Sequence, residues 1–296
     1  MTGAVVSDQA PVTLTRDLVA LTKPRIISLL LVTTVAPMYI AGTPDLMLVL
    51  VVLAGGYLMA GGANAVNMYL DSDIDDLMAR TRLRPIPSGR LAAPAVLAFG
   101  IALATAATFL LARFANVLAA ALALGGFYCY VFVYTRWLKR SSPQNIVIGG
   151  AAGAFPPLVG WAAMTGRIDL TAVYLFLIIF YWTPPHFWAL ALLKQRDYGN
   201  AGVPMAPLVW GERGTMDQML WYTILLLGLT LLPVAFGALG IVYLVSAVVL
   251  GGLLLHGVLR VRRETQWTGA AWWTYKYSLL YLALLFAAMV VDRRIA

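Results

Sequence analysis

The stretch Asn67–Gly89, NMYLDSDIDDLMARTRLRPIPSG, directly follows an apolar run and concentrates charge in an otherwise oily chain. It holds aspartates at 71, 73, 75 and 76 and arginines at 80, 82 and 84. Charged side chains at the end of an apolar helix are costly near a bilayer, so such a cluster indicates function. The cluster is therefore the first candidate site, and the run before it is a candidate membrane helix.

Helical spacing makes part of this cluster suitable for a metal ion. If residues 67–75 continue the preceding helix, Asn67, Asp71 and Asp75 are four residues apart, and each step drifts by only ~40°. They then share one face, whereas Asp73 falls on the opposite side. Mg²⁺ usually binds through one or two carboxylates plus substrate phosphates. A solvated loop whose acids pair with the following arginines is the alternative.

Composition defines the class of protein. Of 296 residues, 61% are hydrophobic and 11% are charged, which excludes an ordinary soluble domain and indicates a polytopic helical membrane protein. The net charge of +8 lies in short loops between apolar spans, a pattern typical of membrane topology, so no nucleic-acid partner is predicted. The single cysteine, Cys129, excludes an intrachain disulfide. No cleavable signal peptide is expected.

Uncharged stretches of about 20 residues predict nine transmembrane helices in one domain covering 1–296. We expect them near 26–43, 47–69, 93–112, 115–134, 143–164 and 170–190, then two in 218–259 that break near Gly237–Gly240, and one near 273–291. Residues 1–25 are expected to form a cytoplasmic lead-in. Its part from 11 to 25 is amphipathic and ends at a Lys23-Pro24-Arg25 corner.

Nine spans with a cytoplasmic N-terminus place the loops 70–92, 135–142, 191–216 and 259–272 on one side. Sixteen lysines and arginines then lie inside and four outside, with Lys276 left uncounted. The positive-inside rule therefore puts the Asn67–Gly89 cluster on the cytoplasmic face of the plasma (inner) membrane. The segment after 170–190, LLKQRDYGNAGVPM (192–205), carries Asp197 on the same side, a faint repeat that suggests two halves facing a central cavity.

Basic residues beside the cluster are candidates for binding a diphosphate. The guanidinium of Arg84 matches phosphate geometry, and Lys139 and Arg140 face the same choice on the next cytoplasmic loop, just after Tyr134. Binding to the inner leaflet is an equally good alternative. Pro85-Ile86-Pro87 predicts an extended turn.

The segment WTPPHFW (182–188) places His186 directly after a double proline. Two prolines predict a kink that frees backbone carbonyls, which membrane helices tolerate mainly where they line a cavity. The imidazole is then a heme ligand, a proton carrier or a core histidine, and the residue alone leaves all three open.

Several motifs together resemble a known family. Asn67-x-x-x-Asp71-x-x-x-Asp75, followed by RTRLRPIPSG (80–89), resembles the first aspartate-rich motif of the UbiA superfamily of intramembrane prenyltransferases. LTKPR (21–25), LKR (138–140), PQNIVIGGAAGAFPPLVGW (143–161), WTPPHFWALAL (182–192) and RDYGNAGVPM (196–205) resemble its heme-farnesylating branch. The resemblance covers nearly the whole chain. One departure is the second motif, where only Asp197 matches and Lys194 stands where an acid is common.

The resemblance implies an all-α bundle of nine transmembrane helices around a central lipid-facing cavity. It also implies Mg²⁺-dependent transfer of farnesyl from farnesyl diphosphate to a vinyl group of heme b. The implied sites are Asn67, Asp71 and Asp75 for Mg²⁺ with Asp197 at a second metal site, Arg84, Lys139, Arg140, Tyr134, Lys194 and Arg196 for substrate, and His186 for heme. The expected partners are both substrates and membrane lipid, with a heme A synthase or a terminal oxidase assembly protein as a docking candidate.

Two alternatives remain open. A superfamily member could prenylate an aromatic quinone precursor, although WTPPHFW and AGVPM argue against that branch. A transporter could use the acids to bind a coupling ion, but transporters place such charges near mid-span, whereas these acids lie at helix ends.

Overall fold

A computed structural model of the protein describes residues 13–295, so expectations for residues 1–12 lie outside the described residues. These described residues form helices and no strand, and nine helical stretches are long and apolar enough to cross a membrane. The spans are α2 (Pro24–Ala41), α3 (Leu46–Leu70), α5 (Ala93–Phe114), α6 with η1 and α7 (Val117–Tyr128, Cys129–Leu138, Lys139–Ser141), α8 with α9 (Asn145–Gly149, Ala151–Thr165), α10 (Leu170–Leu193), α13 (Gly211–Ala235), α14 (Ile241–Arg263) and α15 (Thr268–Ile295). The short helices are α1 (Leu14–Thr22), α4 (Ser72–Leu77), α11 (Gln195–Asn200) and α12 (Ala206–Val209).

The predicted all-α fold with nine spans is confirmed, and so is the break near Gly237–Gly240, because α13 ends at Ala235 and α14 begins at Ile241. Several helices are longer than predicted. The predicted bounds stop at the first charged residue, where the apolar run ends. The helix itself continues beyond that residue, because its backbone hydrogen bonds extend into the polar interface. Thus α13 begins at Gly211 and α15 reaches Ile295. The stretch expected as one helix over 143–164 is two, with Gly150 between them.

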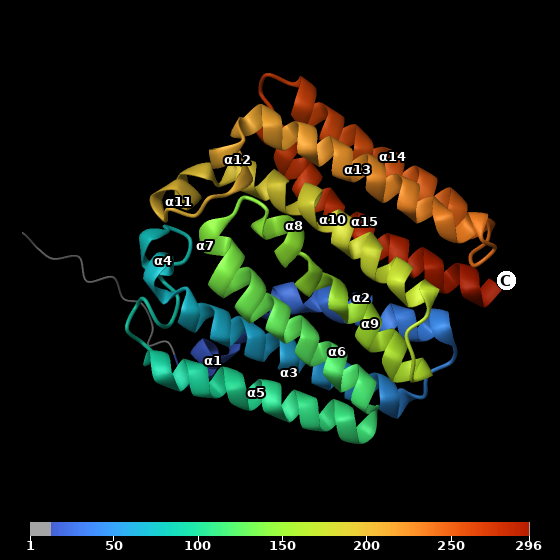
Figure 1. Cartoon of the computed structure of the whole chain (residues 1–296), viewed down its shortest axis with the longest axis horizontal. Helices are drawn as coiled ribbons and strands as arrows, with labels where there is room; N and C mark the ends of the chain where they lie inside the picture. The colour runs from blue at the N-terminus through green and yellow to red at the C-terminus, as the bar shows by residue number, and fades with distance from the viewer. Residues whose placement is uncertain (1–12, 296) are drawn as a thin grey trace, which may run out of the picture.

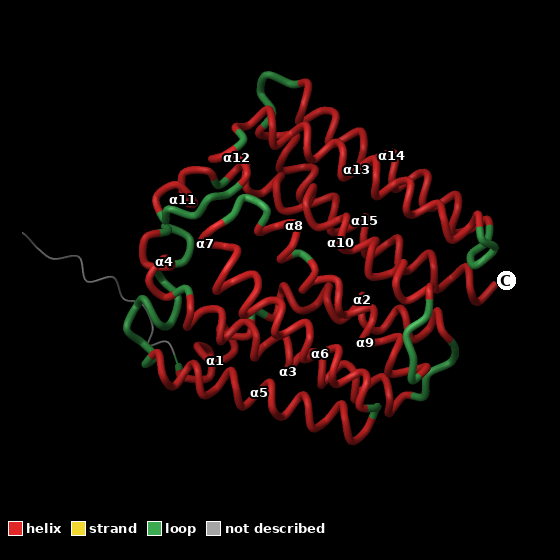
Figure 2. The backbone as a smooth tube through the Cα atoms, in the orientation of Figure 1, coloured by secondary structure: helices red, strands yellow, loops and turns green. Residues whose placement is uncertain are grey.

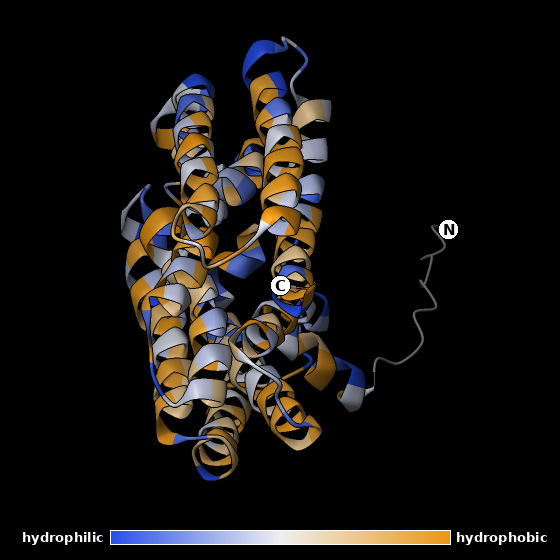
Figure 3. Ribbon diagram, turned by 90° about the vertical axis from the view of Figure 1, so that its right-hand side faces the viewer, coloured by the Kyte–Doolittle hydropathy of each residue, from blue (hydrophilic) through white to orange (hydrophobic). Residues whose placement is uncertain are grey.

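Apolar residues cover most of the helical surface, and hydrophilic residues gather mainly at helix ends and loops (Figure 3). Small residues let the spans approach closely, as membrane helices require. A Cβ added at Gly62 of α3 would lie 2.6 Å from the Gly100 carbonyl oxygen of α5, and one at Gly100 would lie 2.9 Å from the Gly62 oxygen. The two helices are therefore in backbone contact at this crossing.

The short helices mark one end of the bundle. α4, α7, α11 and α12 gather there (Figure 1), and the loops beside α4 and α11 lie at this end too (Figure 2). Ile74 and Met78 of the α4 segment belong to the same buried apolar cluster as Val203 and Met205, which follow α11. The two motif loops predicted to face the same side are therefore packed against each other.

The faint sequence repeat has a structural counterpart. α3 is followed by Asp71 and the six-residue helix α4, and α10 is followed by Lys194 and the six-residue helix α11. Each long span thus ends at the same end of the bundle in a one-residue break and a short polar helix.

The lead-in packs onto this end through α1. Leu21 is fully buried in a cluster with Met68 of α3, and the buried Asp17 accepts from Arg90 Nε at 3.0 Å. Lys23 then turns the chain into α2 with a left-handed φ of 55°. The predicted corner at Lys23-Pro24-Arg25 is therefore present.

Candidate active site

Helical register survives the break between α3 and α4. The Asp71 amide donates to the Asn67 carbonyl at 2.9 Å, and the Asp75 amide donates to the Asp71 carbonyl at 2.8 Å. As a result Asn67, Asp71 and Asp75 are all buried, whereas the Asp73 side chain is 61% exposed. The structure thus brings the three predicted ligands inside the protein and leaves Asp73 outside.

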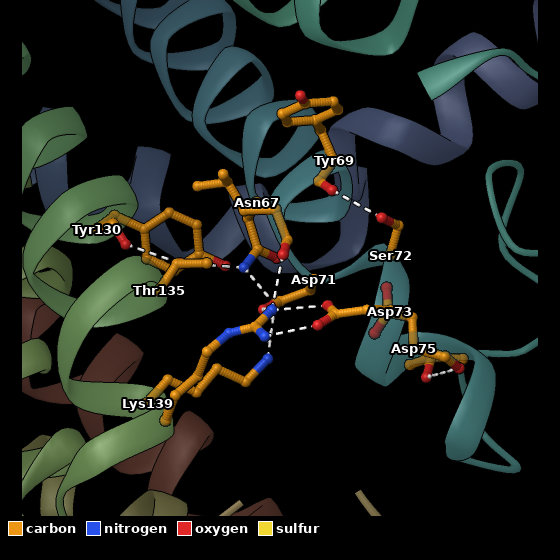
Figure 4. A network of polar contacts seen from close by, with 12 residues as sticks. Asn67, Tyr69, Asp71, Ser72, Asp73, Asp75, Tyr130, Thr135 and Lys139 are labelled. Carbon is orange, nitrogen blue, oxygen red and sulfur yellow. Dashed lines mark hydrogen bonds and ion pairs between the residues drawn. The ribbon is translucent and has the colours of Figure 1, made fainter. Parts of the chain in front are cut away.

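Asp71 accepts from two side chains at one oxygen. Lys139 Nζ lies 2.6 Å and Asn67 Nδ2 lies 2.7 Å from Asp71 Oδ2 (Figure 4). Asn67 also donates to Thr135 Oγ1 at 3.1 Å and accepts from Lys23 Nζ at 3.0 Å. The amide is therefore fixed from three elements, and it in turn fixes the Asp71 carboxylate.

Asp75 pairs with a different cationic side chain, that of Arg84. Arg84 Nη1 donates to Asp75 Oδ2 at 2.5 Å, and Thr81 Oγ1 donates to the Asp75 carbonyl at 2.8 Å. Thr81 therefore folds the loop back so that Arg84 reaches the carboxylate. The extended turn expected at 85–87 is wrong, because backbone bonds such as that from Gly89 to the carbonyl oxygen of residue 86 close successive compact turns.

The two buried carboxylates each keep one oxygen without a hydrogen-bond partner among the described residues, Asp71 Oδ1 and Asp75 Oδ1. A buried acceptor without a partner costs free energy, and a hard cation satisfies it. Within residues 13–295 no group of three or more His, Cys, Asp or Glu side chains comes together, so a metal here rests on these two acids and on oxygens brought by a ligand. That donor set fits Mg²⁺.

Lys23 is a member of the site that the sequence analysis left without a role. Burial lowers the pKa of its ammonium to about 7. The positive charges of Arg84 and Lys139 act in the same direction. The carboxylates of Asp75 and Asp71 oppose them. The five charges are thus close enough to influence one another, and the signal in the sequence was the LTKPR motif.

The helix that carries Lys139 also differs from expectation. The predicted helix 115–134 continues to Ser141, and its part η1 (Cys129–Leu138) is π-helical, a form frequent at functional sites. η1 supplies Thr135 to Asn67 and stacks Tyr130 on Tyr134 with ring centroids 5.7 Å apart. Lys139 and Arg140 are therefore helical residues, not loop residues.

Arg140 faces the exposed side of the cluster. Its guanidinium donates to both Asp73 oxygens at 2.6 and 2.7 Å and to the Leu70 carbonyl at 2.7 Å. The Arg140 bond holds the pKa of the Asp73 carboxyl below its usual value. Arg140 also lies 3.8 Å from Asp71 Oδ1, so it remains within reach of the buried acid.

The second motif lies across from the first, on α11. Burial raises the pKa of the Tyr198 phenol, and the charge of Arg80 is the largest influence that opposes it, so the loop after α4 reaches α11. Asp197 is half-buried and Arg196 is exposed. Lys194 instead lies 5.9 Å from the Trp272 ring centroid. The metal role of Asp197 and the substrate roles of Arg196 and Lys194 stay predictions.

His186 is held firmly within α10, which runs without interruption through Pro184 and Pro185. Its ring stacks on Trp182 at 4.4 Å and on Tyr275 at 4.9 Å between centroids, and its Nδ1 lies 2.7 Å from Ser278 Oγ. Ser278 Oγ–H already donates to the Tyr275 carbonyl at 2.8 Å. A hydroxyl has one proton, so when that proton goes to the Tyr275 carbonyl, His186 Nδ1–H donates to Ser278 Oγ and Nε2 keeps its lone pair. The heme role stays a prediction.

Asn145, in the segment beside Tyr134, is the other polar residue that sequence reasoning missed. It is fully buried on α8, and both its amide nitrogen and its amide oxygen have no partner in the described chain. Gly149 on the same helix leaves room for the Tyr134 ring. Its neighbours Ser142 and Gln144 are polar as well, so nothing in the sequence set Asn145 apart.

The chain matches the UbiA prenyltransferase family over residues 29–285 and belongs to that family. Among its relatives are proteins named protoheme IX farnesyltransferase. One, from Roseiflexus sp. (strain RS-1), is 58% identical over 295 residues, which are 99% of this chain and 55% of the relative. Another, from Symbiobacterium thermophilum, is 52% identical over 283 residues, which are 94% of both chains. The chain spans about half the length of the Roseiflexus relative.

Solved structures share the fold. A digeranylgeranylglyceryl phosphate synthase superposes with a TM-score of 0.75 at 18% identity, covering 95% of this chain and 99% of the other. A UbiA homolog from Archaeoglobus fulgidus, solved with DMAPP and Mg²⁺, gives 0.68 at 16% identity, covering 93% and 99%. The likeness extends over nearly the whole bundle and makes this chain a multi-pass membrane protein of UbiA fold.

Proposed function

We propose that the chain transfers the farnesyl group of farnesyl diphosphate to a vinyl group of protoheme IX (heme b), in a reaction that depends on Mg²⁺ and gives heme O and diphosphate. The observation that carries the proposal is the pair of buried acids, Asp71 and Asp75, each with one oxygen hydrogen-bonded to a cationic side chain and one oxygen without a hydrogen-bond partner. Relatives at 52–58% identity are named protoheme IX farnesyltransferase, which supports protoheme IX as the farnesyl acceptor.

The donor half of the site suits a diphosphate. Asp71 and Asp75 would hold the Mg²⁺, and the metal would supply electrostatic stabilisation of phosphate oxygens. Asn67, expected as a third ligand, already accepts from Lys23 and donates to Asp71, so its amide orients that carboxylate. Arg84 and Lys139 already lie against these acids, so their N–H groups are positioned for the diphosphate oxygens. The Archaeoglobus homolog of the same fold was solved with DMAPP and Mg²⁺, which supports a prenyl diphosphate and Mg²⁺ as ligands here.

The chemistry follows from charge. Cleavage of the carbon–oxygen bond creates an allylic cation and a diphosphate anion, and Arg84 and Lys139 are placed to stabilise the anion where its charge develops. Aromatic faces such as Tyr134 shield the cation. The vinyl carbon of heme attacks the allylic carbon. Water then adds to the resulting cation and loses a proton, which leaves a hydroxyethyl group.

The positive-inside count supports a cytoplasmic N-terminus and a cytoplasmic active site in the plasma (inner) membrane. Diphosphate and Mg²⁺ are then reached from water, whereas the farnesyl tail lies in an apolar cavity open to lipid. His186, on α10, is the heme-side residue. Docking of a heme A synthase or a terminal oxidase assembly protein would deliver the product onward.

The test is mass spectrometry of heme extracted after the purified chain receives heme b, farnesyl diphosphate and Mg²⁺. Farnesylated heme is expected from the wild type, and Asp71→Ala and Asp75→Ala should abolish it while both variants still insert in the membrane. Full activity in either variant would remove the metal proposal. Prenylation of 4-hydroxybenzoate, supplied in place of heme b, would favour the quinone branch. Mg²⁺-dependent diphosphate release without any transmembrane gradient would exclude a transporter.

A further inference from the structure

Two lysines from different helices converge on one aromatic ring beside His186. Lys194, at the C-terminal end of α10, and Lys276 of α15 lie with Nζ 5.9 and 5.8 Å from the Trp272 ring centroid. Neither lysine forms an ion pair with an acidic side chain in the described part of the chain. The two ammonium groups therefore both contact the Trp272 ring, and neither has an acidic counter-ion among the described residues.

The faces of α15 show what this pair can reach. Tyr277 Oη donates to the Leu250 carbonyl, so that side of α15 faces α14. Tyr275 and Ser278 face α10, where they hold His186. Trp272 and Lys276 are one turn apart and share the remaining flank, which is exposed. Lys276 and Trp272 are exposed and Lys194 is half-buried, so the pair lies at the surface beside the helix faces that hold His186.

Aromatic contacts join the lysine pair to His186. Tyr275 stacks on His186, and its ring is edge-to-face with Trp272 at 5.9 Å. Along α10, eight residues separate His186 from Lys194, which is ~12 Å of helix. A flat ligand lying over this aromatic row would have its centre near His186 Nε2 and one edge near both ammonium groups.

We propose that Lys194 and Lys276, held over Trp272, form a carboxylate-binding subsite that takes the two propionates of the heme acceptor. The inference rests on the proposed function and names the part of the acceptor that the site recognises. Protoheme carries two carboxylates on one edge of its ring, and the vinyl groups lie away from that edge. Pairing the propionates with the lysines therefore orients the ring so that a vinyl group faces the prenyl donor.

The lysines also suit a second anion, the phosphate of a lipid headgroup, because cations beside tryptophan are common at membrane interfaces. The two sources differ in one respect that can be measured. Esterified propionates remove the negative charge from heme and leave lipid phosphate unchanged, so heme dimethyl ester separates them.

The experiment measures affinity of the full chain, in neutral phosphatidylcholine nanodiscs, for heme b and for heme dimethyl ester. Wild type should prefer heme b by about tenfold or more, the value of one charged pair. Lys194→Gln with Lys276→Gln should reduce this preference to near unity by lowering the affinity for heme b and not the affinity for the dimethyl ester. Lys276→Arg should keep it. Arg260→Gln removes an exposed cation that pairs with Glu264, and it is the matched control.

Equal wild-type affinities for heme b and its ester would overturn the subsite, and so would a double variant that keeps the preference. Loss of co-purified anionic lipid from the double variant with unchanged heme preference would assign the lysines to lipid instead. Failure of the proposed function is distinct: the wild type would then form no farnesylated heme from heme b, whatever the lysines do to binding.

Discussion

Lys139 Nζ lies 2.6 Å from Asp71 Oδ2, although the two residues are 68 positions apart in the chain. Both side chains are largely buried, so neither charge is screened by water. A buried ion pair of this kind adds little stability by itself, but removal of one partner leaves the other charge uncompensated. The pair therefore links the integrity of the bundle to the site that we assign to the diphosphate.

Lys139→Met should lower the free energy of unfolding by about 3 kcal/mol, because Asp71 is left buried without its main counter-ion. Added Mg²⁺ should restore part of that loss, since the metal replaces the missing charge. The measurement is the thermal unfolding midpoint in detergent with Mg²⁺ and with a chelator. Lys139→Arg is the control that keeps the charge.

The double variant Asp71→Asn with Lys139→Met distinguishes charge from packing. Its destabilisation should be smaller than that of Lys139→Met alone, because no unpaired charge remains. If the double variant is destabilised by the sum of the losses measured for Asp71→Asn and Lys139→Met separately, the 2.6 Å contact contributes no interaction energy.

Lys23 combines strain with function. A left-handed φ of 55° costs an L-residue about 1 kcal/mol, and glycine avoids that cost. Lys23→Gly should therefore be more stable than Lys23→Ala by about 1 kcal/mol. Both variants lack the ammonium that donates to Asn67 Oδ1 at 3.0 Å, so both should bind farnesyl diphosphate more weakly. Calorimetric titration alongside thermal unfolding tests the two effects, and a glycine variant with wild-type affinity would remove Lys23 from the site.

Much of the fold was predictable because a helix that crosses a bilayer needs a long apolar run. Loops cannot lie in the hydrocarbon region, because their backbone polar groups would have no hydrogen-bond partner there. The nine spans and the break after Ala235 follow from that constraint. Helix ends such as Gly211 and the division at Gly150 were not predictable. They depend on polar residues at the interface and on local backbone geometry, which hydropathy does not record.

The site was predictable only where its residues share one helix. Asn67, Asp71 and Asp75 could be grouped from their spacing, since helical geometry fixes their common face. Lys23 could not be grouped in this way, because it lies between α1 and α2 and only the packed structure brings its ammonium to Asn67. The π-helical turn of η1 likewise leaves no mark that hydropathy detects.

Gly100→Ala should destabilise the protein by about 1–3 kcal/mol, the usual cost of overpacking. The added Cβ would lie 2.7 Å from Val66 Cγ2 and 2.9 Å from the Gly62 carbonyl oxygen, so α3 and α5 must separate. Gly228→Ala on α13 is the matched control, because a Cβ there meets nothing within 4 Å, and it should be neutral or slightly stabilising. Equal unfolding midpoints for the two variants would contradict the close crossing.

His186→Ala should weaken heme binding and leave farnesyl diphosphate binding unchanged, because Nε2 is the ring nitrogen left free by the bond to Ser278. Ser278→Ala should have a smaller effect of the same kind, since the ring loses its orientation but stays stacked on Trp182 and Tyr275. Separate titrations with heme and with farnesyl diphosphate measure both. Unchanged heme affinity in His186→Ala would assign the residue to the core.

Asp292→Ala should destabilise the end of the bundle opposite the aspartate cluster without changing substrate binding. The buried Asp292 carboxylate accepts from the Gly240 and Tyr243 amides at 2.5 and 3.1 Å, so it caps α14, whose N-cap residue Gly240 has no side chain to do so. Loss of such a cap costs about 1–2 kcal/mol, and the negative charge adds a favourable interaction with the helix dipole. Asp292→Asn keeps an acceptor and should lose less. The unfolding midpoint should therefore fall in the order wild type, Asn, Ala, with farnesyl diphosphate affinity constant; a change in that affinity would mean that the two ends are coupled.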